Sequence, residues 1–301
     1  MEAGIVPLTV AWPRRVLAWL PPAVVVAAAL ALGQRLAPWQ RLAMTSFVLY
    51  LALKVTAVLL RPPGTLAARP AAGWLLYLTA WPGMELAPFA QRRPRPGPEP
   101  RAWARRGLAG MALGLGLAAG LAVFADRLGD EVVGWAGIAA LLATFHLGWA
   151  LVLSALVRLA GFDVGPLFDD PLASRSLTEF WSRRWNLAFV EMDRLLFLPP
   201  LHRLLGRRLA VPGVFLASGV MHELAISYPA GAGWGGPLAY FALHAVLVPL
   251  ERVLRPGHWP ALAARAWTWL WLLGPLPLLF HGPFRAELVV PLFHALHRQI
   301  G

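Results

Sequence analysis

The chain has 301 residues, of which 58% are hydrophobic and only 14% are charged, and its formal net charge is +12. A soluble domain carries about 25% charged residues, so this composition excludes an ordinary soluble domain. In a bilayer the same apolar side chains face a compatible solvent, and the sequence therefore predicts an integral membrane protein. Cysteine is absent, which excludes disulfides, zinc thiolates and a cysteine nucleophile.

Eight apolar stretches approach the length of about 20 residues that a helix needs to cross a bilayer. The predicted fold class is all-α, a polytopic transmembrane helical bundle of about eight spans. The third stretch is interrupted by Pro82 and Glu85, and the seventh is short. In chain order the stretches are 16–33, 43–60, 73–90, 107–125, 132–159, 211–228, 236–250 and 264–281.

Arginine supplies almost all of the positive charge, since Lys54 is the only lysine. The arginines gather in three loops, 91–106, 183–208 and 252–265, which lie on one side if eight spans alternate. The positive-inside rule places that side in the cytoplasm and both termini outside. Because the arginines lie between apolar spans, they favour membrane topology over nucleic-acid binding. Arginine usage also indicates a GC-rich genome, and with it a bacterial inner membrane.

Residues 161–210 are not simply hydrophobic, because six acidic residues lie there beside seven arginines. This segment contains Phe180-Trp181-Ser182-Arg183-Arg184-Trp185-Asn186. In a helix, Trp181, Trp185 and Phe189 would share one face, since they are spaced by four residues. The segment is predicted as an amphipathic cytoplasmic loop. One alternative is an interfacial helix with aromatic rings among the headgroups and arginines reaching water.

His222 and Glu223 lie well inside the stretch 211–228, where ionisable side chains are costly and indicate a functional site. Ser218 precedes His222 by one turn and shares its face. Ile226 stands where a zinc-protease helix needs its second histidine, so this is no such metal site. A neutral histidine can take a proton from a hydroxyl. The alternative is a histidine bonded to a neighbouring helix.

Other ionisable residues are less informative. His244 shares a face with Glu251 and could line the same cavity as His222 or belong to the core. His294 and His297 share a face but lack a third ligand, so no metal site is predicted. His146 has no evident partner, and Lys54 and Glu85 could pair with each other or reach the membrane interface.

Two of these patterns together are similar to a known family. The motif at 180–186 resembles the FWxRRWN signature of wax synthases, members of the membrane-bound O-acyltransferase superfamily. The stretch SGVMHE at 218–223 resembles that family's histidine motif, and the resemblance extends over about 161–252. It implies transfer of an acyl group from acyl-CoA to the hydroxyl of a lipophilic alcohol, with His222 and Asn186 as catalytic residues.

In this hypothesis the partners are acyl-CoA, which is a co-substrate and not a cofactor, a lipophilic alcohol and membrane lipids, without nucleic acid. The whole chain 1–301 forms one domain: N-terminal spans in 1–160, the motif loop in 161–210, and the catalytic-histidine and C-terminal spans in 211–301. The alternative function is a transporter or lipid scramblase with an intramembrane His/Glu site, which the lack of internal repeats disfavours. The predicted substrate-binding residues are Trp181, Arg183, Arg184, Trp185, Ser218, Glu223 and His244.

Overall fold

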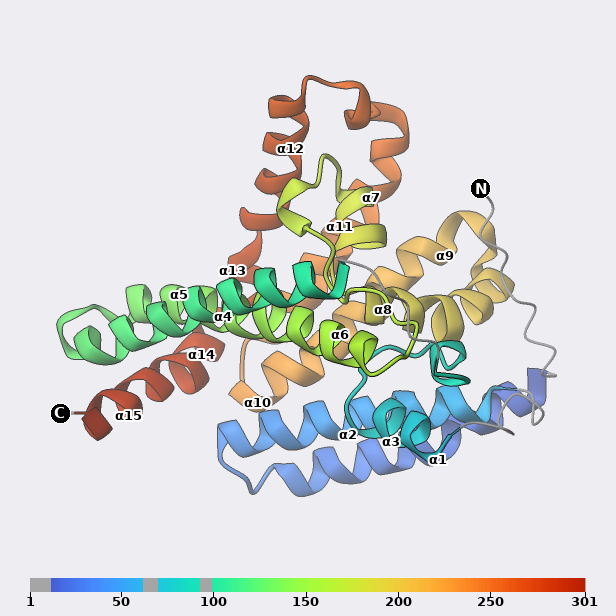
Figure 1. Ribbon diagram of the computed structural model, residues 1–301, viewed down its shortest axis with the longest axis horizontal. Helices are drawn as coiled ribbons and strands as arrows, with labels where there is room; N and C mark the ends of the chain where they lie inside the picture. The colour runs from blue at the N-terminus through green and yellow to red at the C-terminus, as the bar shows by residue number, and fades with distance from the viewer. Residues whose placement is uncertain (1–11, 62–69, 93–98, 301) are drawn as a thin grey trace.

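The computed structural model describes residues 12–61, 70–92 and 99–300, and all regular structure within them is helical (Figure 1). Six helical runs in this part of the chain are long and apolar enough to cross a membrane. The structure thus agrees with the predicted all-α, multi-pass membrane protein. The six runs are Val16–Gly33, Pro38–Leu59, Glu99–Arg127, Asp130–Leu159, Leu187–Ala230 and Gly236–Leu254.

The predicted span at 73–90 is wrong. Helix α3 (Ala71–Thr79) has nine residues, which rise about 14 Å, whereas the hydrocarbon core is about 30 Å thick. The chain then runs without regular structure through Pro82 and Gly83 to Leu86. Proline has no N–H to donate and fits poorly inside a helix, which explains why the helix does not continue.

The predicted span at 264–281 exists as two pieces. Helices α12 (Ala261–Leu273) and α13 (Leu276–Leu279) are separated at Gly274 and Pro275. Together they return along α11 (Gly236–Leu254), because the Tyr240 hydroxyl donates to the Leu272 carbonyl at 3.2 Å and the Leu278 carbonyl lies against Gly236. This stretch therefore accompanies α11 as an interrupted helix (Figure 1).

The first two helices form a pair on one side of the molecule, α1 (Trp12–Gly33) and α2 (Pro38–Leu59) (Figure 1). Helix α4 (Glu99–Phe124) packs along a second run, α5 (Asp130–Leu141), η4 (Leu142–Trp149) and α6 (Ala150–Leu159). A Cβ atom at Gly114 would lie 2.5 Å from the backbone nitrogen of Thr144, so glycine is what permits this close approach.

The basic loops gather at one end of the bundle. Arg158 at the end of α6 pairs with Glu99 at the start of α4 at 3.7 Å. Glu251 near the end of α11 accepts the Leu177 N–H at 2.7 Å. The start of α1 lies at this same end, because the chain crosses the bundle twice, through α1 and back through α2, before it reaches the loop that precedes α4. The prediction placed the start of the first span at the end opposite the basic loops. The structure places it at the basic end, because the span predicted at 73–90 does not exist.

The C-terminal helix lies at the opposite end, as predicted. The His297 ring in α15 (Val290–Ile300) bonds the Ala122 carbonyl near the end of α4 at 2.7 Å. The predicted linker at 91–100 carries several of the arginines. Its residues 93–98 lie outside the described residues, and Glu99 already belongs to α4.

Candidate active site

The tryptophan–arginine motif is not one continuous helix. Helix α7 (Leu177–Glu179) continues into a π-helical turn, η6 (Phe180–Arg184), and stops at Trp185, which is extended at φ −101° and ψ 126°. Asn186 is left-handed at φ 44° and ψ 64°, and α8 (Leu187–Met192) starts after it. Asparagine tolerates this conformation better than most residues. The prediction that Trp181, Trp185 and Phe189 share one helical face is therefore wrong.

The two tryptophans of the motif are half-buried and pack against other rings of the protein. Trp185 is stacked between Phe180, with ring centroids 5.2 Å apart, and His146, with centroids 5.6 Å apart. Trp181 packs edge-on against His244 at 5.3 Å, and also contacts Phe215 and Phe241. Aromatic pairs at these distances stabilise the arrangement beyond the area they bury. The motif is therefore a structured part of the helical core.

Buried and charged groups hold the motif segment in place. Glu251 accepts the backbone N–H groups of Leu177 and Thr178 at 2.7 and 2.8 Å, which satisfies two free donors at the start of α7. Arg184 binds Glu179 at 2.7 Å and donates to the carbonyls of Asp169 and Asp170. The guanidinium of Arg184 thus ties the segment to its own loop.

The contacts of Glu179 also affect the pKa of its carboxyl group. Burial alone would raise the pKa of its carboxyl, but hydrogen bonds from the Arg175 backbone and from Arg184, with the positive charge of both, hold that pKa below its ordinary value. Arg183, by contrast, is exposed. The two arginines of the motif therefore have different surroundings: Arg183 is exposed, whereas the Arg184 side chain is paired and 25% exposed.

His222 ends α9 (Leu198–His222), whose direction changes at Gly206, and is followed by a π-helical turn, η8 (Glu223–Ser227). Its Nδ1 lies 2.7 Å from the Ser218 carbonyl oxygen. A carbonyl only accepts, so Nδ1 carries the proton of the neutral ring and Nε2 carries the lone pair. The ring packs on Phe241 with centroids 4.4 Å apart. The Ser218 carbonyl thus selects the tautomer that a general base requires.

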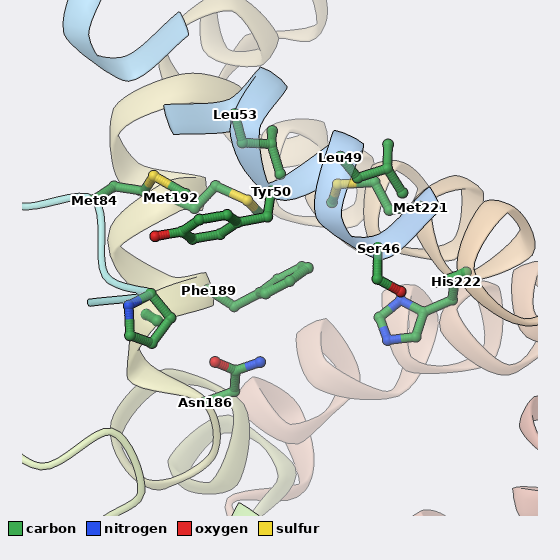
Figure 2. Close-up of a pocket in the computed structure, with 13 residues that line it drawn as sticks. Ser46, Leu49, Tyr50, Leu53, Met84, Asn186, Phe189, Met192, Met221 and His222 are labelled. Atoms are coloured by element: carbon green, nitrogen blue, oxygen red, sulfur yellow. The ribbon is translucent and has the colours of Figure 1, made fainter. Parts of the chain in front are cut away.

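Asn186 and His222 line one pocket of about 280 Å³ between α2, the segment 82–84, α8 and the end of α9. Figure 2 shows the Asn186 amide at one edge and the His222 ring at another, with the Phe189 ring between them. The rest of the wall is largely apolar. The lining residues are Ser46, Leu49, Tyr50, Leu53, Pro82, Met84, Asn186, Ala188, Phe189, Met192, Met221, His222 and Ala225.

Two other predicted site residues, Glu223 and His244, do not line this pocket and have structural contacts instead. Glu223 accepts the N–H groups of Gly235 and Leu238 at 2.9 and 3.0 Å, which caps the start of α11. His244 is fully buried, with Nδ1 2.9 Å from the Tyr240 carbonyl, so it does not share a cavity with His222. These contacts hold in place the helices that surround the pocket.

The sequence interpretation missed the pocket wall at 81–86. Irregular backbone at membrane depth is tolerated only where protein groups satisfy it. The polar side chains that do so come from distant parts of the chain. The Tyr50 hydroxyl donates to the Trp81 carbonyl, the Lys54 ammonium to Gly83 and the Arg61 guanidinium to Met84, while the Glu191 carboxylate accepts the Glu85 N–H.

Lys54 is only 1% exposed and does not pair with Glu85 as predicted, because Glu85 faces Arg61 at 3.4 Å. A lysine inside an apolar stretch, followed later by Pro-Gly, is the signal that could have located this wall. The lysine compensates for backbone groups that no helix satisfies.

His146 was also missed. It lies in the π-helical segment η4, and its ring stacks on Trp185 with an interplanar angle of 8°. Single π-turns within α-helices occur frequently at functional sites. The structure therefore brings a second histidine next to the residue that precedes Asn186.

Within the described residues, no group of three or more acidic or histidine side chains is arranged to hold a metal ion. His294 lies 2.9 Å from Asp126, and His297 contacts the same carboxylate at 3.0 Å. These pairs join α15 to the loop after α4.

These features define a class: a multi-pass helical membrane protein in which a histidine and an asparagine line one largely apolar pocket. Residues 164–243 match the membrane bound O-acyl transferase family, and the match contains both Asn186 and His222. The resemblance in the sequence motifs is thereby confirmed for this segment.

Several plant proteins are similar to part of the chain. It is 34% identical over 125 residues to a long-chain-alcohol O-fatty-acyltransferase of Simmondsia chinensis, covering 37% of this chain and 35% of that protein. It is 36% identical over 118 residues to a probable long-chain-alcohol O-fatty-acyltransferase 2 of Arabidopsis thaliana, covering 36% and 34%. An acyl-CoA–sterol O-acyltransferase 1 of the same plant is 35% identical over 100 residues, covering 29% of each. The chain thus spans about a third of the length of the relatives it matches.

Proposed function

We propose that this protein is a membrane-bound O-acyltransferase that moves an acyl group from acyl-CoA to the hydroxyl of a lipophilic alcohol. The observation that carries the proposal is the presence of Asn186 and His222 in one apolar pocket. The family match over both residues supports it. The relatives are named for long-chain alcohols and a sterol as acceptors, which supports an acceptor that dissolves in lipid.

The chemistry follows from the tautomer of His222. Its Nε2 lone pair takes the proton of the acceptor hydroxyl while that oxygen attacks the thioester carbonyl carbon. The negative charge that develops on the carbonyl oxygen accepts a hydrogen bond from the Asn186 amide, a contribution of about 3–4 kcal/mol in such sites. The C–S bond then breaks, and the proton on His222 passes to the CoA sulfur. Ester and CoA thiol are the products.

The donor's head group requires a charged, water-facing site. CoA carries several phosphate charges, and guanidinium groups bind phosphate through two parallel hydrogen bonds. Arg183 is exposed at the basic end of the bundle and is suited to this role, while Arg184 orients the segment that presents it. Trp181, Trp185, Ser218, Glu223 and His244 act in this proposal by positioning. In this proposal the protein lies in a bacterial inner membrane, and its basic end, with the amphipathic segment that carries the motif, faces the cytoplasm.

Purified protein incubated with radiolabelled long-chain acyl-CoA and a panel of alcohols tests the proposal. The expected result is a labelled ester with at least one lipophilic alcohol and release of free CoA thiol in equal amount. Folded protein that forms no ester with any alcohol in the panel, sterols included, would refute it.

A further inference from the structure

A second apolar space adjoins the pocket. It has a volume of about 350 Å³, lies between α1, α2 and α9, and has no polar surface. Its lining residues are Trp19, Pro22, Ala23, Val26, Leu49, Ala52, Leu53, Phe197, Ala217, Val220 and Met221.

The two spaces are separated by side chains that they share. Leu49, Leu53 and Met221 line both. In Figure 2 these three lie on the far side of the pocket from Asn186. Leucine and especially methionine side chains change rotamer at little cost, so a ligand can pass between them. The second space is therefore a continuation of the first, away from the polar residues.

The direction of the substrate follows from this arrangement. An alcohol whose hydroxyl lies at His222 must place its carbon chain along an apolar path, and the shared residues lead to the second space. This space opens at the surface of α1, because Ala23 both lines it and is exposed, as is the neighbouring Val24. A lipid-dissolved molecule can therefore reach it from the bilayer. No charged side chain lines it to receive the phosphates of CoA.

We propose that the space between α1, α2 and α9 holds the far end of the acceptor's aliphatic chain and that Ala217, on its wall, limits the length of chain that fits. This inference rests on the proposed acyltransferase function. Short alcohols fill only the first pocket. Each further methylene that enters the second space gains packing contacts with its walls, so kcat/KM rises with chain length until the space is full.

The variant Ala217→Phe tests the inference, because Ala217 lines the second space and not the first. Ala119→Phe is the matched control, since Ala119 is exposed on α4 and lines neither space. Ala23→Phe fills the second space from the opposite wall and replaces Ala217→Phe if that variant does not fold. For each, kcat/KM is measured along a series of straight-chain alcohols with one acyl-CoA, and along a series of acyl-CoA lengths with one short alcohol.

The expected result for Ala217→Phe is wild-type activity, within about twofold, with the shortest alcohols and a loss of tenfold or more with the longest. The control should follow the wild-type profile. The same alcohol profile in both variants and wild type would overturn the inference, as would a shift confined to the acyl-CoA series, which would assign the space to the donor. Absence of ester from the wild-type protein with every alcohol would instead refute the acyltransferase function itself.

Discussion

Trp185 stacks on His146 with their rings only 8° from parallel and their centroids 5.6 Å apart, and the next residue is Asn186. The stack joins the middle of the fourth helical run, Asp130–Leu159, to the backbone that carries the proposed oxyanion donor. Because no hydrogen bond from His146 fixes Trp185, the contact depends on the shape and flatness of the ring.

Replacing His146 tests this positioning role. His146→Phe keeps a flat ring beside Trp185, so kcat should stay within about threefold of wild type. His146→Ala removes the stack and should lower kcat about tenfold, with a smaller change in KM for the alcohol. If His146→Phe loses as much activity as His146→Ala, the imidazole nitrogens matter, and the stacking role is refuted.

Asn186 has two roles that different substitutions separate. Asn186→Gly keeps the left-handed backbone available but removes the amide, so kcat should fall by about 10²–10³ with little change in thermal stability. Asn186→Ala should lower kcat as much and also destabilise the fold, by about 1–2 kcal/mol of left-handed strain. Measured kcat and melting temperatures of both variants separate the effects. Near-normal kcat for the glycine variant would show that Asn186 serves only the backbone.

Arg183 and Arg184 should respond differently to lysine. Arg183→Lys keeps the charge but loses the two-pronged phosphate contact, so KM for acyl-CoA should rise several-fold while KM for the alcohol and the melting temperature stay unchanged. Arg184→Lys loses its fork on Glu179 and should chiefly lower thermal stability. Steady-state kinetics and melting curves make the comparison. An unchanged donor KM in Arg183→Lys would assign the CoA head group to another part of the basic surface.

The absence of cysteine allows a direct test of topology. Single cysteines can replace Gly129, Gly165 and Gly257, which are exposed and have open space where a Cβ would lie. In intact cells, a membrane-impermeant thiol reagent should label Gly129→Cys but not the other two, which lie at the basic end. Labelling of Gly165→Cys and Gly257→Cys on opposite sides would contradict the arrangement of helices described here.

Hydropathy alone predicted the long spans and the cost of an ionisable pair at His222, because lipid imposes length and apolarity on each helix separately. Hydropathy failed where contacts with other parts of the chain determine the local structure. The spacing of Trp181, Trp185 and Phe189 fits a helix, yet contacts of the segment with its own loop break it at Asn186. Lys54 and Glu191 stabilise irregular backbone at 81–86, and no periodic pattern shows that contact. The partner of His146, Trp185, could not be predicted, because His146 lies in a π-turn, where ordinary helical spacing does not apply.

The central claim is that His222 is the base that activates the acceptor hydroxyl, and ester formation by purified His222→Ala tests it most directly. His258→Ala is the matched control, since His258 is exposed and does not line the pocket. The account predicts that His222→Ala inserts and folds with the same yield and melting temperature as wild type but forms ester at least 10²-fold more slowly, while the control keeps wild-type turnover. Near-normal turnover of His222→Ala would contradict it.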